Sequence, residues 1–456
     1  MNSAIYDSIL FKDSFGTEEM RKIFSEESLV QKWLNVESAL SKVQAKLDMI
    51  PNEAAKEIER KAQIDQMDLK DMGNEIKKTN HPIIPLIRQL SDVCENNYGQ
   101  YVHWGATTQD IMDSANVLQL KEVVTIVERD IKYIQESLMN LIEIYDDVVL
   151  AGRTHGQQAL PITFGYKASV WLSEINRNSD RLQELKPRLM VGQFSGAVGT
   201  LASIHQNGLK LQEALMKELE LEEPVISWHA ARDNFAEFAS FLAILASTLG
   251  KISNEIVQLQ KTEFGELAEP FEMGKVGSST MPHKRNPSKT ENVVTLTRIL
   301  QSNIPLFLSG MVNEHERDMI SWQVEWETLP EICLLISNIL KNSKEVLREL
   351  HVNEEKMYHN VTELTNGLIM SEPVMLKIGE KIGRQKAHDI VYEASMEAYE
   401  KGEYFEDVLL KYPEIMKNMT KEELDNLFNI TNYVGYSKDY SKRVVSLTKE
   451  KQRNRG

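Results

Sequence analysis

The sequence predicts an all-α protein, and three observations carry that prediction. Glycine and proline, which most often interrupt helices, number only 22 and 13 among 456 residues, and they occur in clusters. Neither occurs in 106–151, 225–249 or 331–366, and these stretches are much longer than the mean globular helix. Within them apolar residues recur at helical spacing, whereas the alternation typical of strands is scarce. Long helices packed in a bundle are therefore expected.

The clearest single helix is expected in 106–151. Its apolar side chains recur every three or four residues, while Glu128, Lys132 and Glu136 fall off that stripe. The stripe consists of Val127, Ile131, Ile134, Leu138, Leu141 and Ile142. Residues 238–249 are also apolar, but this run is too short to span a bilayer and is preceded by Glu237. It is expected to be a buried helix.

The chain is expected to have three parts. Residues 1–105 predict shorter helices, punctuated by Pro51, Gly73, Pro82, Pro85 and Gly99. Residues 106–355 predict the central bundle of long helices. In 356–456 glycine and proline become frequent again, so shorter helices are expected, and the chain ends in a basic tail expected to be solvated.

Composition excludes several classes of protein. With 52 Lys+Arg against 68 Asp+Glu, the net charge is −16, which argues against a nucleic-acid binder. Cys94 and Cys333 are isolated, so neither a disulfide framework nor a zinc site is expected. The first residues lack the basic and apolar segments of a secretory signal, and no membrane span is expected. We therefore expect a cytoplasmic protein.

Three polar segments at predicted helix boundaries concentrate hydroxyl, imidazole and amide groups: 103–110 (HWGATTQD), 152–158 (GRTHGQQ) and 274–287 (GKVGSSTMPHKRNP). Helix ends leave backbone N–H groups unpaired, so anions can bind there. The third segment is the most distinctive, because glycines and prolines frame two serines, a lysine and an asparagine. Judged by these residues alone, a helix cap or a surface turn is an equal alternative. A P-loop is excluded because its Gly-Lys-[Ser/Thr] spacing is missing.

The segment GSSTMPHKRNP at 277–287 resembles the signature loop of the fumarase/aspartase superfamily and matches GSSxMPxKxN at every fixed position. HWGATTQD and GRTHGQQALPITFG are similar to the first and second signature regions of that family. The resemblance extends over nearly the whole chain. It implies an all-helical fold of three parts, a homotetramer whose active sites combine three chains, and no metal or organic cofactor.

The resemblance also implies a reaction and its residues. Members remove a proton beside a carboxylate and expel a group from the neighbouring carbon, usually releasing fumarate. The doubly negative intermediate needs preorganised donors and cations. The match places Ser278 as the base, His155 as the group that assists the leaving group, and Glu291 as the carboxylate partner of His155. The implied substrate-binding residues are Thr107, Thr108, Gln109, Thr154, Met281, Lys284, Asn286, His81 and Arg317.

The other histidines are less defined. His81 matches an active-site histidine of adenylosuccinate lyases, although Pro82 directly after it departs from the pattern. His103 is expected to be structural, and His229 has no assigned role.

Two departures point away from a nucleotide substrate. Adenylosuccinate lyases bind a nucleotide phosphate with an N-terminal Arg-Tyr, where this chain has Ser14-Phe15, and with a later arginine, where it has Trp326. An indole cannot pair with a phosphate as a guanidinium does. Since Trp322, Trp326 and Leu329 share a helical face, simple core packing is the alternative explanation for these side chains.

The segment around Trp326 instead resembles 3-carboxy-cis,cis-muconate cycloisomerases, which generally lack the histidine found here as His155. This mixture predicts a lyase that releases fumarate from a small succinyl adduct through a C–S or C–N bond, as S-(2-succino)cysteine lyases do. Adenylosuccinate lyase, the cycloisomerase and a non-catalytic helical protein remain as alternatives. The leaving group itself is left open.

Overall fold

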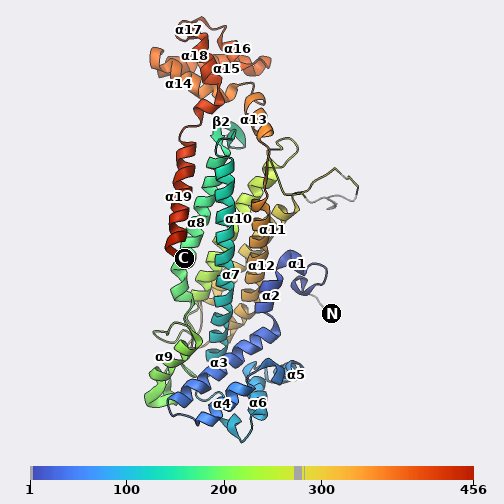
Figure 1. Ribbon diagram of the computed structural model, residues 1–456, viewed down its shortest axis with the longest axis vertical. Helices are drawn as coiled ribbons and strands as arrows, with labels where there is room; N and C mark the ends of the chain where they lie inside the picture. Colours follow the sequence, from blue (N-terminus) through green and yellow to red (C-terminus); the bar gives the residue numbers. More distant parts are fainter. Residues whose placement is uncertain (1–3, 272–279, 282, 456) are drawn as a thin grey trace. The chain divides into compact units, whose positions relative to one another are not determined.

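The computed structural model describes residues 4–271, 280–281 and 283–455. The described residues form nineteen α-helices and two antiparallel sheets of two strands each (Figure 1). Short 3-10 helices and loops join them. The all-α fold class predicted from the sequence is therefore confirmed.

The chain divides into two compact units, which are described separately. The first contains Met1–Asp130, Asn178–Ser247 and Thr295–Lys341, and the second contains Ile131–Arg177, Thr248–Val294 and Asn342–Gly456. The sequence analysis divided the chain into three consecutive parts with boundaries near residues 105 and 355, whereas each of these units combines three separate segments. The three-part division stays a prediction.

Five long helices contribute residues to both units: α7 (Thr108–Ile144), α8 (Phe164–Leu189), α10 (Asp233–Leu259), α11 (Ser288–Gly310) and α12 (Met319–Arg348). The predicted stripe of α7 is buried, with each of its six side chains at most 4% exposed. Lys132 and Glu136, which fall off the stripe, are exposed. Helical periodicity therefore identified the buried face of α7 correctly.

Proline interrupts these helices less than the sequence suggests. Pro187 lies inside α8, Pro305 inside α11 and Pro330 inside α12. An interior proline removes one backbone hydrogen bond and costs about 3 kcal/mol, which packing on both sides of it can offset. As a result, α12 begins at Met319, well before the breaker-free stretch that starts at residue 331.

The first unit also holds the shorter helices α1 (Lys12–Phe15), α2 (Glu18–Ile23), α3 (Glu26–Lys46), α4 (Asn52–Lys61), α5 (Leu69–Thr79), α6 (Ile83–Val93) and α9 (Gly208–Leu219). The Ser25 hydroxyl caps α3 by accepting the Ser28 N–H, and α3 packs against α4 and α9 (Figure 1). Ion pairs join the long helices here. Lys186 of α8 lies 2.5 Å from Glu128 of α7, and Arg188 of α8 pairs with Glu237 of α10.

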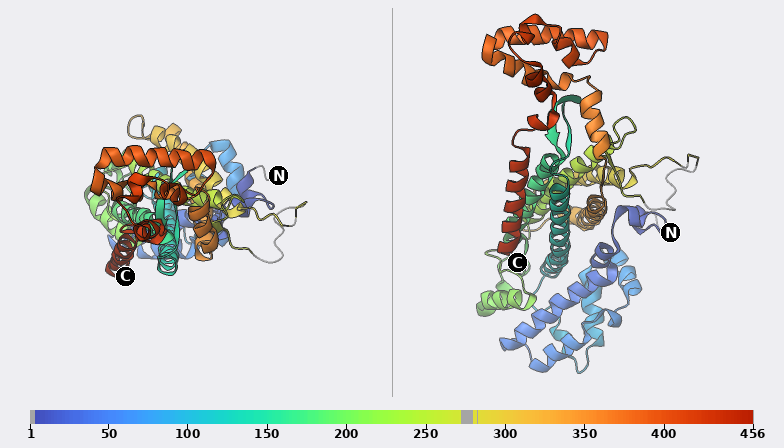
Figure 2. Two further views of the ribbon diagram at one scale, coloured as in Figure 1. Left: turned by 90° about the horizontal axis from the view of Figure 1, so that it is seen from above. Right: turned by 45° about the horizontal axis from the view of Figure 1, so that its top comes forward.

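The second unit contains the hairpin of β1 (Val149–Thr154) and β2 (Gln157–Thr163), the pair β3 (Leu267–Ala268) and β4 (His351–Val352), and α13 (Glu354–Glu363). Figure 2 shows α14 (Ser371–Ile382), α15 (Arg384–Lys401), α16 (Phe405–Leu409), α17 (Pro413–Met416) and α18 (Lys421–Phe428) gathered in one cluster, in orange and red. Buried side chains such as Val374, Ala394 and Phe405 form its core. The last helix, α19 (Ser437–Arg455), is tied to α8 by Asn176, which donates to Thr448 at 2.7 Å.

Among the described residues, α10 is the helix long and apolar enough to cross a membrane by length and composition. However, 67% of its most apolar window is buried within the protein, as in a core helix. Phe238, Leu242, Leu245 and Leu249 are completely buried. The buried helix predicted over 238–249 is confirmed as part of α10.

Candidate functional site

The residues predicted for the site fall into two groups, one in each compact unit. The first unit holds His81, Thr107, Thr108, Gln109 and Arg317. The second unit holds Thr154, His155, Met281, Lys284, Asn286 and Glu291. Ser278, the predicted base, lies outside the described residues.

In the first group, Asp110 organises the loop that leads into α7. This carboxylate is fully buried and accepts the Thr107 N–H at 3.0 Å, the Ser195 N–H at 2.9 Å and the Gly196 N–H at 2.9 Å. Its Oδ1 also lies 2.9 Å from Nε2 of His229, which is itself buried. His229, which the sequence left without a role, therefore helps Asp110 hold together segments far apart in the chain.

Thr107 and Thr108 present their hydroxyl groups at the start of α7. Arg317 donates from Nη1 to Thr107 Oγ1 at 2.7 Å, and Nε2 of His81 lies 3.0 Å from Thr108 Oγ1. Nδ1 of His81 accepts the Ile84 N–H at 3.4 Å, which leaves the ring proton on Nε2, facing Thr108. Since each threonine oxygen accepts a hydrogen bond, each hydroxyl proton remains available to donate. Two hydroxyl donors beside the Arg317 guanidinium can together bind a carboxylate group.

The charge of His81 supports this arrangement. Burial, together with the nearby His103 and Arg317, lowers the pKa of His81 below its usual value. His81 is therefore neutral near pH 7, as is required for its Nδ1 to accept the Ile84 N–H. The match of His81 to an active-site histidine stays a prediction, but the structure places its ring against Thr108.

His103 and Gln109 support this loop. Burial opposes a charge on His103, but Glu37, whose Oε1 lies 2.6 Å from His103 Nδ1, and Asp110 together raise the pKa of His103. This contact fits the structural role expected for His103. The Gln109 side chain is 2% exposed and donates from Nε2 to the carbonyl oxygen of His229. Gln109 thus stabilises the loop, and its predicted contact with substrate remains untested.

In the second group, His155 lies at the tip of the β1–β2 hairpin. His155 and Gly156 form a two-residue turn in which both have positive φ, 52° and 75°, as a type I′ turn requires. The preceding Arg153 anchors the hairpin by binding the buried Glu266 at 2.5 and 3.0 Å. This turn leaves Thr154 and His155 exposed.

His155 makes no hydrogen bond or ion pair within the described part of one chain, so the predicted bond to Glu291 is not formed there. Glu291 lies exposed in the first turn of α11. That helix start is fixed by Glu269, which accepts the Lys289 N–H at 3.2 Å and the Thr290 N–H at 2.6 Å. The pairing of His155 with Glu291 therefore stays a prediction.

The remaining residues of the second group belong to the signature segment. Met281 and Lys284 are exposed and Asn286 is half-buried, all just before α11. Arg285 lies over the ring of Phe271, 4.2 Å from its centre. This places a cation and an amide at the N-terminus of a long helix, where the helix dipole also favours an anion.

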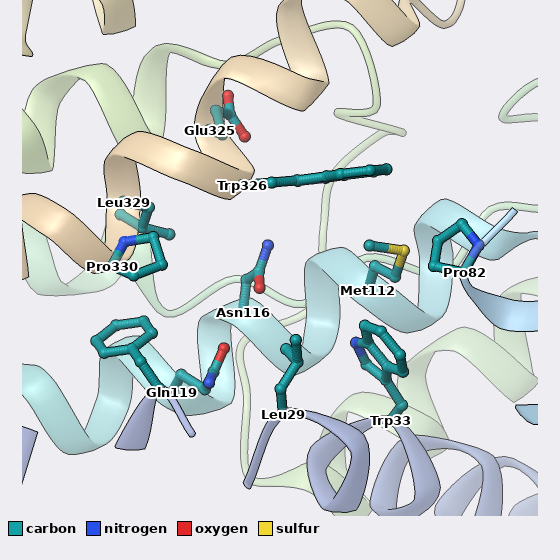
Figure 3. A pocket seen from close by; sticks show the side chains of 11 residues that line it. Leu29, Trp33, Pro82, Met112, Asn116, Gln119, Glu325, Trp326, Leu329 and Pro330 are labelled. Carbon is teal, nitrogen blue, oxygen red and sulfur yellow. The ribbon is translucent and has the colours of Figure 1, made fainter. Parts of the chain in front are cut away.

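A cavity of about 170 Å³ lies beside the first group (Figure 3). Pro82, which follows His81, and Met112, one turn after Thr108, both line it. The other lining residues come mainly from α3, α7 and α12: Phe24, Leu29, Trp33, Asn116, Gln119, Glu325, Trp326, Leu329 and Pro330. The sequence suggested that Trp322, Trp326 and Leu329 pack in the core. Trp322 and Leu329 are 3% exposed, whereas Trp326 is half-buried and faces the cavity.

A buried ion cluster holds this wall of the cavity in place. Arg232, whose side chain is 1% exposed, binds Asp113 of α7 at 2.8 and 3.1 Å and Glu325 of α12 at 2.9 Å. The indole of Trp322 also donates to Asp113, at 3.2 Å. Burial raises the pKa of Glu325. With two carboxyl groups against one guanidinium, the cluster offers no surplus positive charge to the cavity.

The described residues show no group of three or more His, Cys, Asp or Glu side chains able to hold a metal ion. The two groups instead offer hydroxyls, an arginine, a lysine, an amide and imidazoles. Such groups can bind carboxylates and transfer protons.

Comparison with known proteins places this arrangement in a family. Residues 14–300 match the family described as Lyase, and residues 367–444 match the adenylosuccinate lyase C-terminus. The chain belongs to the fumarase/aspartase superfamily of lyases. The resemblance of its three signature segments to that family is therefore confirmed.

Two relatives and one solved structure show the range of this branch. The lyase is 41% identical to the N-acetyl-S-(2-succino)cysteine lyase of Dickeya dadantii over 435 residues, covering 95% of each chain. It is also 41% identical to the adenylosuccinate lyase of Methanocaldococcus jannaschii, covering 96% of this chain and 95% of that protein. The structure of 3-carboxy-cis,cis-muconate lactonizing enzyme from Pseudomonas putida has a TM-score of 0.91 and 35% identity, covering 96% and 98% of the two chains.

Sequence reasoning gave no role to Asp110 or His229 and did not single out the cavity residues Trp33, Met112 and Asn116. The three cavity residues belong to no spacing that signals chemistry, because they come from separate segments of the chain. Asp110 did stand at the end of HWGATTQD, so a buried acid in that segment was the available signal.

Proposed function

We propose that this lyase cleaves a small succinyl thioether of the S-(2-succino)cysteine type by β-elimination and releases fumarate. The observation that carries the proposal is the cavity near the start of α7, which is lined by Trp326 and, among the residues that the structure describes, by no lysine or arginine. The name of the Dickeya relative supports this choice, as does its identity over nearly the whole chain.

The cavity is poorly suited to a nucleotide phosphate. A phosphate needs charge-assisted hydrogen bonds, each contributing about 1.5–3 kcal/mol. Within the described part of the chain, the charged side chain in this lining is the carboxyl of Glu325, which already binds Arg232.

The reaction follows from the placement of donors. The Thr107 and Thr108 hydroxyls, with Arg317, hold one carboxylate of the succinyl group. Ser278 removes the proton from the carbon beside the other carboxylate, and Lys284 and Asn286 stabilise the resulting dianion. The C–S bond then breaks as the C=C bond of fumarate forms. His155 protonates the departing thiolate, a good leaving group because free thiols have a pKa near ~8.5.

A substrate panel tests this function. We expect fumarate release from S-(2-succino)cysteine adducts, and at least roughly a hundredfold lower kcat/KM with adenylosuccinate, because two or more phosphate contacts are missing. Initial rates measured by absorbance on one enzyme preparation, with N-succinyl amino acids and carboxymuconate alongside, separate the alternatives. Efficient cleavage of adenylosuccinate alone would restore a nucleotide substrate, and turnover of carboxymuconate alone would indicate a cycloisomerase.

Assembly belongs to the same proposal. The residues proposed for the reaction are divided between the two units, with the threonine hydroxyls in the first and His155 in the second. We propose a cytoplasmic homotetramer in which different chains supply these groups to one active site. The absence of a bond partner for His155 within one chain's described residues supports this arrangement.

Mixing two inactive variants tests shared sites. Thr108→Ala and His155→Ala should each be inactive, and co-refolded mixtures should regain up to about a quarter of wild-type activity, because some sites then receive both intact residues. Light scattering of the wild type should give the mass of four chains. An active monomer, or mixtures that remain inactive while assembling normally, would contradict shared sites.

A further inference from the structure

The hairpin that carries His155 contains a β-bulge close to its turn. The register of β1 and β2 shifts between Gly152 and Arg153, and beyond this shift Arg153 lies opposite Gln158. A bulge changes the direction of nearby side chains and is frequent beside active sites. Arg153 and Gln158 are thus a cross-strand pair, one pair away from the turn that contains His155.

Both members of this pair bind partners outside the hairpin, and those partners bind each other. The Arg153 guanidinium makes two hydrogen bonds to the Glu266 carboxylate, at 2.5 and 3.0 Å. Gln158 donates from Nε2 to the carbonyl oxygen of Asn360 at 3.0 Å, and Nδ2 of Asn360 donates to Oε1 of Glu266 at 2.8 Å. The four residues therefore close a ring, in which Glu266 accepts three of the hydrogen bonds.

The ring is buried, whereas the turn beside it is exposed. Glu266 is completely buried and Asn360 is 2% exposed, and the Arg153 guanidinium lies 5.1 Å from the ring centre of Phe264. Residues 154–157 are exposed. A two-pronged pair between a guanidinium and a carboxylate fixes orientation as well as distance, and burial shields it from salt. Glu266 thus sets the direction in which the hairpin presents its turn.

His155 depends on this anchor. Its side chain is exposed and makes no hydrogen bond or ion pair with the residues that the structure describes in its own chain. A proton donor has to lie within hydrogen-bond reach of the departing atom, and a misplacement of about 1 Å can lower a rate about a hundredfold. The position of the imidazole therefore follows from the position of the turn.

We propose that Glu266 and Arg153 are positioning residues for His155: their ion pair holds the turn so that the imidazole reaches the departing atom of the substrate. This inference rests on the proposed function, in which His155 protonates the leaving group. Such a role predicts a dependence on the leaving group. An anion that departs without a proton does not need His155, and its departure therefore does not depend on Glu266.

Two adducts that differ in the acidity of their thiol test this role. Glu266→Gln keeps the shape of the side chain but removes its charge and the two-pronged pair. It should lower kcat at least about tenfold for S-(2-succino)cysteine, because a thiol of this kind has a pKa near ~8.5 and its departure is assisted by a proton. With the S-(2-succino) adduct of an acidic arylthiol, whose thiolate leaves unprotonated, the loss should be less than about threefold.

A second variant keeps the test independent of one substitution. Arg153→Lys keeps the cation but not the planar fork that pairs with Glu266, so it should show the same dependence on the leaving group. Thermal unfolding and circular dichroism of each variant check that it folds.

Two control variants and one double variant separate positioning from folding. Glu237→Gln removes the same group from the two-pronged pair with Arg188 in the first unit, and Asn176→Leu removes buried hydrogen bonds in the second unit. Both should leave the ratio of the two rates at its wild-type value, although Asn176→Leu should lower the melting temperature. Adding Glu266→Gln to His155→Ala should cause no further loss with the cysteine adduct, because the group that is positioned is already gone.

The outcomes are distinguishable. Equal losses with both adducts, or a further loss in the double variant, would mean that Glu266 only stabilises the fold; this overturns the inference and leaves the proposed function standing. If N-succinyl amines react and thioethers do not, the proposed function fails, and the double-variant comparison made with an N-succinyl amine still decides the role of Glu266. Turnover of carboxymuconate alone would overturn both, because no leaving group would then need a proton from His155.

Discussion

Replacing Ser278 by alanine should lower kcat by about a hundred- to ten-thousandfold while leaving the helical content intact. Removal of the proton beside a carboxylate needs a positioned base, and such groups contribute about 10²–10⁴ to rates. The resemblance of 277–287 to the family's signature loop predicts Ser278 as that base. The measurement is fumarate release at saturating adduct, with circular dichroism on the same sample.

Ser288→Ala provides the matched control. Ser288 is exposed at the first position of α11, so its loss removes a hydroxyl of the same kind close in sequence to Ser278. We expect near wild-type turnover from this variant. If Ser278→Ala retained more than about a tenth of the rate, its loss would be worth less than ~1.4 kcal/mol, and another group would have to be the base.

Replacing Arg232 by methionine should destabilise the protein by about 3–5 kcal/mol, because it leaves two carboxyl groups buried without their cation. Asp113 is completely buried and Glu325 is 3% exposed, and both bind Arg232. Arg232 also lies over the rings of Trp228 and Phe235, about 5 Å from each centre, so its packing is lost as well. Urea-induced unfolding followed by circular dichroism measures the change.

Arg188→Met is the matched control, because it removes an arginine from an exposed ion pair instead of a buried one. Arg188 also makes a two-pronged pair, with Glu237, but the side chains are 57% and 41% exposed, and such pairs contribute about 0–1 kcal/mol. Replacing the whole cluster, with Asp113→Leu and Glu325→Leu added to Arg232→Met, should regain much of the lost stability. Equal stability of Arg232→Met and Arg188→Met would show that the buried carboxyl groups do not depend on Arg232.

The sequence by itself determined the helical class, the buried face of α7 and the segments that carry the chemistry. These features depend on local signals. Apolar residues at helical spacing fix which face is buried, and glycine, proline and hydroxyl residues mark where a helix gives way to a loop. The family resemblance added roles for residues such as Ser278 and His155, which no periodicity could supply.

Only the tertiary structure decided which distant residues meet. Pro330 predicts a helix break, yet α12 continues through it, since packing along α12 outweighs one lost hydrogen bond. His229 gains its role from Asp110, 119 positions away along the chain. Trp326 stands where a phosphate-binding arginine was expected and on a face expected to pack in the core, but in the structure it is half-buried and lines a cavity that Trp33 also lines. Burial, hydrogen-bond satisfaction and cavity shape depend on side chains from separate helices, and no local pattern encodes them.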